Sequence, residues 1–240
     1  MIASMILIVI FMMSVVVIHE TGHLLAAKHL GLRVDSFSVG MGPKLISKKI
    51  NRTEYCLRLF PVGGSCEIPD KGINSVTAGE KALVYLAGPA INGITGAIFT
   101  ALAVIAAKGI SGITAIPEML KTVFLLPYHI ARQFVSTSIY DMGGLVKASG
   151  ETDLAGLMQL NPVAVAFLVM AMFSVILMIF NLIPLPPLDG GEALYAGIEK
   201  LFGKNDKLHK AVASVTWAVL ITLNVMAVFD DVLYVLKELI

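Results

Sequence analysis

Four long apolar segments restrict this chain to a protein that crosses a membrane several times. They run over residues 1–30, 82–107, 163–183 and 211–229, and each approaches or exceeds the roughly 20 residues that span a hydrocarbon core. Of all 240 residues, 57% are hydrophobic and 15% are charged, compared with roughly 45–50% and 25% in soluble domains. We therefore expect an α-helical polytopic membrane protein with about four transmembrane helices, forming a single membrane-embedded domain over residues 1–240.

The first apolar segment is expected to be a retained transmembrane helix and not a cleaved signal peptide. No basic residue precedes its apolar run, and it has no small-residue cleavage site. Cleavage near residue 20 would also destroy a motif of ionisable residues at the end of this segment.

The distribution of basic residues predicts how the chain is oriented in the membrane. Eight lysines and arginines lie in the first connection and four in the third, whereas the second connection, on the opposite face, holds four. Cytoplasmic loops carry the excess of basic residues. The first and third connections are therefore expected in the cytoplasm and both termini outside.

The first two connections have patterns of their own. The segments VDSFSVG and TEYCLRLF alternate apolar and polar residues and are separated by turn signals, which predicts a small β-hairpin or sheet over residues 34–68. Cys56 and Cys66 lie in this region; they could pair, but a cytoplasmic loop favours two free thiols. Apolar residues recur at helical spacing within residues 110–160, which favours an amphipathic helix in the outer membrane interface.

The sequence HETGH, residues 19–23, stands at the end of the first apolar segment. Its two histidines are four residues apart, so on a helix they share one face and can both bind a zinc ion. Glu20, beside the first histidine, could then act as a general base on a metal-activated water. Because of the predicted orientation, this motif is expected near the cytoplasmic end of its helix.

A catalytic zinc site needs a third protein ligand, and Asp189 is the best candidate. It lies in the stretch NLIPLPPLDGG, whose three prolines cannot continue the preceding helix, so the backbone is expected to open into a loop over residues 184–191. A charged group at the bilayer centre costs about 2.5–3.5 kcal/mol. Zinc binding contributes about 10–16 kcal/mol in structural sites, which offsets several such groups if they converge on one ion.

Three motifs in this order resemble those of the site-2 protease family of intramembrane zinc metalloproteases: HETGH (19–23), AGPAIN (87–92) and NLIPLPPLDGG (181–191). The stretches FSVGMGPKL and TEYCLRLFPVGG narrow the resemblance to the bacterial regulator-of-sigma-E-protease type. The similarity covers most of the chain. It implies that Zn²⁺ is the cofactor. His19, His23 and Asp189 would bind the zinc, and Glu20 would be the catalytic acid/base.

The resemblance also implies how a substrate would be held. Asn181 would hydrogen-bond the substrate backbone, and the hairpin, with Phe37 and Tyr55 in its strands, would align an extended substrate by strand addition. The implied substrates are single-pass membrane proteins in the bacterial inner membrane, such as anti-sigma factors or remnant signal peptides. No feature points to nucleic acid, and the oligomeric state is undetermined. Proteases of the regulator-of-sigma-E type usually carry PDZ domains between the second and third core helices. Residues 109–162, which occupy that position here, leave too little room for one.

Other interpretations remain open at this point. Intramembrane His, Glu and Asp can also line an ion path, so a metal carrier or channel is an alternative, although a carrier has no need of Glu20 between two zinc ligands. An inactive family member that serves as a binding scaffold is another. Asn92 could either pack helices together or position the site, and Asn181 could simply cap the opened backbone.

Overall fold

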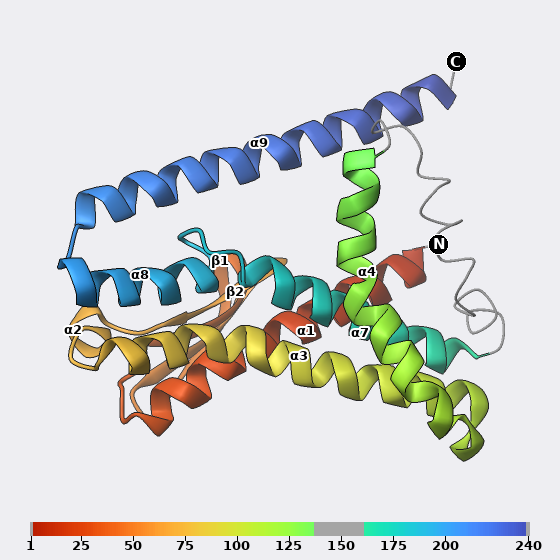
Figure 1. The fold of residues 1–240 in the computed structure, drawn as a ribbon, viewed down its shortest axis with the longest axis horizontal. Coiled ribbons are helices and arrows are strands. Elements are labelled where there is room, and N and C mark those ends of the chain that lie inside the picture. The colour runs from red at the N-terminus through yellow and green to blue at the C-terminus, as the bar shows by residue number, and fades with distance from the viewer. Residues whose placement is uncertain (1, 137–160, 239–240) are drawn as a thin grey trace.

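The computed structural model describes residues 2–136 and 161–238 of the chain. Helices dominate, and one pair of strands follows the first helix (Figure 1). In chain order the elements are α1 (Ile2–His29), β1 (Ser36–Ile50), β2 (Thr53–Glu67), α2 (Asp70–Ile73), α3 (Ala78–Lys108), the 3₁₀ helix η1 (Ile110–Ala115), α4 (Ile116–Ser136), α7 (Pro162–Asn181), α8 (Asp189–Phe202) and α9 (Asp206–Glu238).

Within the described ranges, three helices are long and apolar enough to cross a membrane. They are the segment Val9–His29 of α1, the whole of α3 and the whole of α7, and they correspond to the first three predicted spans. The fourth predicted span, residues 211–229, forms part of the single helix α9. Its role as a membrane span remains a prediction.

The ends of the apolar helices follow from local chemistry. A capping box starts α3: the Thr77 side chain accepts from the Glu80 backbone N–H, and the Glu80 side chain accepts from the Thr77 N–H. Asn161 caps α7 in a similar way by accepting from the Val163 N–H. Pro184, three residues after Asn181, then prevents α7 from continuing, as the sequence predicts.

The helix α3 is the central element, because it contacts α1, α4, α7 and α8. Its contact with α7 is close, since Gly96 lies against Ala171 and Val175. Buried hydroxyls in this interface bond to backbone carbonyls: Thr100 donates to Gly96, and Ser174 donates to Asn92. Small residues with internally satisfied hydroxyls are the usual means of packing helices without exposing polar groups to lipid.

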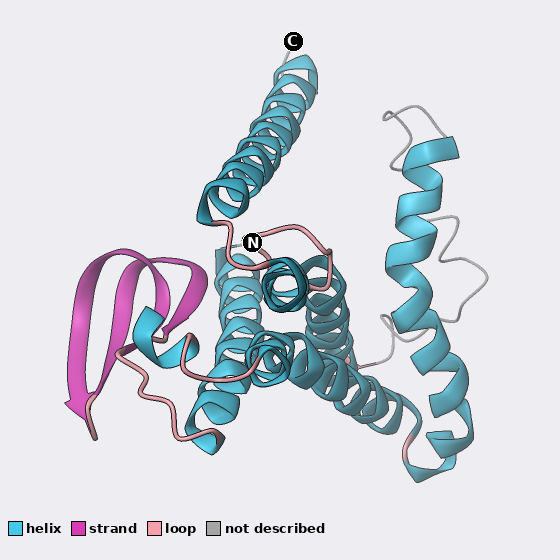
Figure 2. Cartoon of the chain, turned by 60° about the vertical axis from the view of Figure 1, so that its left-hand side comes forward, coloured by secondary structure: helices cyan, strands magenta, loops and turns pink. Residues whose placement is uncertain are grey.

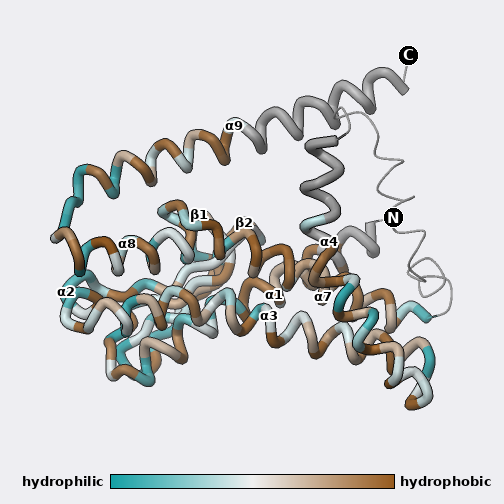
Figure 3. The backbone as a smooth tube through the Cα atoms, in the orientation of Figure 1, coloured by the Kyte–Doolittle hydropathy of each residue, from teal (hydrophilic) through white to brown (hydrophobic). Residues whose placement is uncertain are grey.

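Hydrophobic residues are frequent along the long helices, as the brown stretches in Figure 3 show. Large hydrophobic side chains point outward from every predicted span, whereas buried polar groups lie inside. Examples with at least half of their surface exposed are Ile10 on α1, Ile94 and Ile98 on α3, Val163 on α7, and Val215 and Trp217 on α9. Such faces are costly in water and favourable in lipid, so the exposed pattern fits a protein embedded in a membrane.

The predicted β-element is present, but it is more than a simple hairpin. Both strands are long and bent, so that each pairs through two different segments. Residues 36–39 of β1 lie between residues 64–67 and 54–57 of β2. Residues 46–50 of β1 pair with residues 53–57 of β2. The sheet lies to one side of the helical body, as Figure 2 shows. Phe37 of β1 packs against Leu24 and Ala27 of α1 and so attaches the sheet to this helix. In the strand pairing given above, residues 64–67 pair on one side only, with residues 36–39, so they form one edge of the sheet.

Both cysteines are free thiols, as predicted for a reducing environment. Cys56 is buried in the sheet, and Cys66 is partly buried near α1. Burial, reinforced by the nearby charge of Glu20, raises the pKa of the Cys66 thiol to about 12 from the ordinary value of 9.0. Since the thiolate is the reactive form, its population at pH 8 is about a thousandfold lower than that of an ordinary cysteine.

We predict that a Cys56→Ala variant, in which Cys66 is the only thiol, reacts very slowly with a maleimide in mild detergent at pH 8. Full reaction is expected once the protein is denatured in dodecyl sulfate, because unfolding removes the burial that raises the pKa. Mass spectrometry of the labelled protein measures both rates. Fast labelling of the folded protein would show that this part of the sheet is open to solvent.

Candidate metal centre

The first two residues of the centre come from one face of α1. His19 and His23 are one helical turn apart, and both are buried, with 5% and 8% of their surface exposed. Their Nε2 atoms lie 3.2 Å from each other, and the rings meet edge to face. The helix predicted for HETGH therefore brings both imidazoles to the same point, as the four-residue spacing requires.

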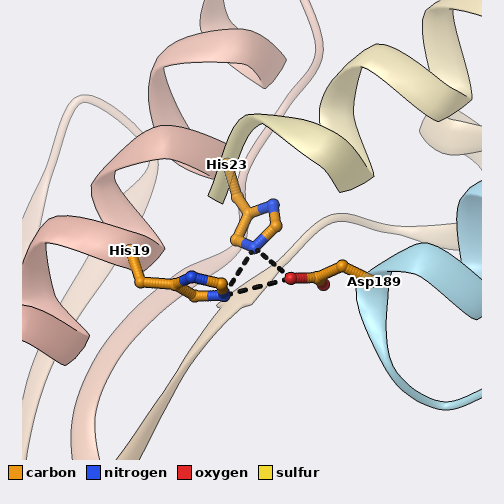
Figure 4. A group of neighbouring side chains, drawn as sticks. All are labelled: His19, His23 and Asp189. Carbon is orange, nitrogen blue, oxygen red and sulfur yellow. Dashed lines mark hydrogen bonds and ion pairs between the residues drawn. The ribbon is translucent and has the colours of Figure 1, made fainter. Parts of the chain in front are cut away.

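The third residue arrives from the break after α7. Residues 182–188 form an irregular turn that contains the three prolines, and Asp189 is the first residue of α8. Figure 4 shows its carboxylate pointing at both histidines. Asp189 Oδ2 lies 3.1 Å from His19 Nε2 and 3.4 Å from His23 Nε2.

The sequence predicts a loop over residues 184–191, but residues 189–191 form the first turn of α8 instead. The reason is close backbone contact between the proline turn and this helix. A Cβ placed on Gly191 would overlap the backbone at Leu185 and Pro186. Only residues without a side chain allow the turn to fold against the helix that carries Asp189.

The geometry of these three residues fits a tetrahedral metal ion. A Zn²⁺ ion with ligand bonds of about 2.0–2.1 Å holds neighbouring ligand atoms about 3.3 Å apart. The three separations in the structure are 3.1, 3.2 and 3.4 Å. Nitrogen lone pairs and a carboxylate oxygen repel one another at such distances unless a proton or a metal cation lies between them. Within the described residues, this is a group of metal-binding side chains close enough to share one ion.

One face of α3 completes the surroundings of both histidines. Residues 84, 88 and 92 of this helix succeed one another at intervals of one turn. His23 Nδ1 donates to the Val84 carbonyl at 2.8 Å, and the Asn92 amide nitrogen lies 3.0 Å from His19 Nδ1. Between these two contacts, a Cβ on Gly88 would overlap His23 Nε2 and would lie 2.8 Å from His19 Cε1. The imidazoles therefore occupy space that exists only because residue 88 is glycine.

Sequence reasoning did not identify Val84 or Gly88, and it left two roles open for Asn92. The AGPAIN motif, residues 87–92, includes Gly88 and Asn92 of this face but not Val84. A helical plot of α3 would have placed Val84, Gly88 and Asn92 in one row, but nothing in that row indicates that it faces the histidines.

Glu20 lies between the histidines and the edge of the sheet. The Glu20 carboxylate is close enough to His19, His23 and Asp189 to interact electrostatically with all three. It also accepts a hydrogen bond from the backbone amide of Cys66. Gly64 of β2 is also close, since a Cβ there would lie 2.8 Å from Glu20 Cγ. The edge formed by residues 64–67 therefore runs directly beside the predicted general base.

Two side-chain contacts, one of them an ion pair, join α8 to its neighbours. Lys81 of α3 donates to Glu199 at 2.7 Å and to Asn74 at 3.0 Å, and its own exposure is only 9%. At the other end of α8, His209 of α9 lies 3.0 Å from Glu192. These contacts tie the helix that carries the third ligand to α3 at one end and to α9 at the other.

The residues predicted to bind substrate make internal contacts in this structure. Asn181 ends α7, and its side-chain amide donates to the Leu177 carbonyl of the same helix at 3.0 Å. Phe37 is buried against α1, and its ring centre lies 5.8 Å from that of Tyr55. The Tyr55 hydroxyl accepts from Lys28 at 3.1 Å. Their roles toward a substrate remain predictions.

Several proteins are similar to parts of this chain. A chloroplastic membrane metalloprotease of Arabidopsis thaliana, ARASP2, named as probable, is 47% identical over 62 residues, which are 26% of this chain and 14% of that protein. A protein of Clostridium perfringens named "Putative zinc metalloprotease" is 36% identical over 87 residues, 33% of this chain and 26% of that protein. One of Chlamydia trachomatis with the same descriptive name is 43% identical over 72 residues, 29% of this chain and 12% of that protein.

These matches span about a quarter or less of the length of the relatives. The match to a whole family is much longer, because the sequence model of Peptidase family M50 covers residues 7–223, from the first apolar helix to well beyond Asp189. The chain therefore belongs to Peptidase family M50, the site-2 protease family of membrane metalloproteases.

Proposed function

We propose that this protein is a zinc endopeptidase that cleaves peptide bonds inside the membrane. The observation that carries the proposal is the convergence of His19, His23 and Asp189 at the spacing of a tetrahedral zinc site. Glu20 lies beside them, on the same helix as the two histidines. Membership of Peptidase family M50 and the names of its relatives support zinc as the metal. In this proposal the three residues bind Zn²⁺ and leave a fourth position open.

When bound, zinc acidifies a water molecule and polarises a peptide carbonyl. The chain itself supplies the proton transfers. Glu20 accepts the proton of the attacking water and passes it to the leaving amine, so one carboxylate serves first as base and then as acid. Its position between the metal ligands and the Cys66 amide supports this role, because the carboxylate is held at the site while one side faces the edge of the sheet.

The substrates we propose are single-pass membrane proteins, such as anti-sigma factors or remnant signal peptides. A peptide bond in a helix is shielded by its own hydrogen-bonded turn, so the substrate has to unwind before it can be cleaved. Residues 64–67 are an edge of the sheet beside Glu20 and could hold the unwound segment as an added strand. In this arrangement Asn181, at the end of α7, would bind the substrate backbone after releasing the Leu177 carbonyl.

The first prediction separates metal binding from catalysis. Purified protein is expected to hold one zinc per chain, and His23→Ala or His19→Ala should remove most of it. Glu20→Gln should keep the zinc but lower cleavage of single-pass substrates in liposomes by at least about a hundredfold, since a general base contributes that much. Elemental analysis measures the zinc, and gel-based assays on a panel of substrates measure cleavage.

Normal zinc content in the His23→Ala protein would refute the ligand assignment. Cleavage by the Glu20→Gln protein at the rate of the unaltered protein would refute the role of Glu20 but leave the ligands untouched. A protein that binds zinc through these residues yet moves metal across liposomes without cleaving any peptide would instead be a carrier.

A second prediction tests the space beside Gly88. Gly88→Ala introduces a methyl group that overlaps His23 Nε2, so zinc should bind at least about tenfold more weakly, because ligand geometry is disturbed. Gly79→Ala is the matched control, since it lies in the same helix and a Cβ there meets nothing within 4 Å. Competition with a chromogenic chelator measures both affinities. Equal affinities in the two variants would show that the imidazoles have room to move.

A third prediction concerns orientation. We propose that the protein lies in the bacterial inner membrane with the sheet and the metal centre near the cytoplasmic face and both termini outside, as the basic residues favour. Lys48 is exposed near the turn between β1 and β2. A Lys48→Cys variant should therefore resist a membrane-impermeant maleimide in intact cells and react once the cells are lysed. Ready labelling in intact cells would show the opposite orientation.

A further inference from the structure

The two histidines of the centre receive different partners on their outer ring nitrogens. His23 Nδ1 faces the backbone carbonyl of Val84 at 2.8 Å. A carbonyl only accepts hydrogen bonds, so the proton of the neutral His23 ring lies on Nδ1, and its Nε2 has a free lone pair. The backbone of α3 therefore selects the tautomer that a metal at the inner nitrogen requires.

His19 faces the side chain of Asn92 in the corresponding position. The Asn92 amide nitrogen lies 3.0 Å from His19 Nδ1. If that nitrogen donated, the ring proton of neutral His19 would be on Nε2, the atom that lies 3.1 Å from Asp189 and 3.2 Å from His23 Nε2. A protonated Nε2 has no lone pair to offer a metal. This orientation of the amide thus conflicts with metal binding by His19.

The amide can resolve the conflict by turning over. Asn92 is completely buried, and its Oδ1 has no hydrogen-bond partner among the described residues. The oxygen and nitrogen of an amide exchange places by a half-turn, and their assignment is inferred from the hydrogen bonds available. Each orientation leaves one of the two atoms without a described partner, so the requirement of His19 decides between them.

We propose that Asn92 is a positioning residue whose Oδ1 accepts a hydrogen bond from His19 Nδ1 and thereby selects the His19 tautomer that binds the metal. This inference rests on the proposed metal site. In this arrangement α3 sets both tautomers, through a backbone carbonyl for His23 and through a side chain for His19. The contact also orients the plane of the His19 ring, because the ring and the amide are both buried.

Two substitutions distinguish an acceptor from a mere filler. Asn92→Asp keeps an acceptor at nearly the same volume, whereas Asn92→Leu keeps the volume and removes the acceptor. Loss of such an outer partner typically weakens metal binding by about 10–100-fold. We expect that loss for Asn92→Leu, and zinc affinity at or above that of the unaltered protein for Asn92→Asp.

Ser174→Ala is the matched control. Its hydroxyl donates to the backbone carbonyl of Asn92, in the same buried interface, but no described contact joins it to His19. Zinc affinity in this variant should stay within about threefold of the unaltered protein, since the outer partner of the ligand is intact. Zinc affinity is measured on the full-length proteins in detergent by chelator competition, and the absorption bands of the Co²⁺ form report ligand geometry.

Nitrogen NMR of the unaltered, zinc-loaded protein with ¹⁵N-labelled histidine gives a second readout, taken with Asn92 in place. A proton on Nδ1 of His19, identified by its loss in His19→Ala, is the expected result. A proton on Nε2 would overturn the inference, as would zinc affinity in Asn92→Leu equal to that of the unaltered protein, or an equal loss in Asn92→Asp and Asn92→Leu. Failure of the metal site itself would appear separately, as zinc binding that His19→Ala does not weaken.

Discussion

The close approach of α3 to α1 is the contact on which the rest of the site depends. Two imidazoles can be buried there only because Gly88 leaves their space empty and because Val84 and Asn92 meet their outer nitrogens. Burying a polar side chain in apolar surroundings costs free energy unless the side chain finds a hydrogen-bond partner there. One helical face therefore supplies both the room and the hydrogen-bond partners that two buried imidazoles need.

The break after α7 solves a second problem of the same kind. A backbone that leaves its helix in an apolar region exposes unpaired N–H and C=O groups. Here the turn over residues 182–188 bonds partly to itself, with Leu185 donating to Ile183 and Leu188 donating to Leu185. The glycines after Asp189 let this turn pack against α8, and the Lys81–Glu199 pair anchors that helix to α3. The third ligand thus comes from the first turn of a helix, although an irregular turn precedes it.

Local patterns predicted many parts of this fold well. Three of the four apolar runs form α1, α3 and α7, the alternating segments form β1 and β2, and α7 ends before the prolines as expected. The errors have a common cause. The extent of the loop before α8, the bent order of the strand segments and the row of Val84, Gly88 and Asn92 all depend on contacts between distant residues, which the local period of a sequence does not contain.

The sequence alone determined that His19 and His23 share a helical face, because the helix period places residues four apart on one side. It also determined that the chain has to break before Asp189, since proline lacks the N–H that a helix needs. Only the tertiary structure decided that Asp189 meets both histidines, that Asn92 faces one of them, and that residues 64–67 run beside Glu20. These meetings join residues more than 40 positions apart, and such distances are set by helix packing and by the bend of the strands, not by any local preference.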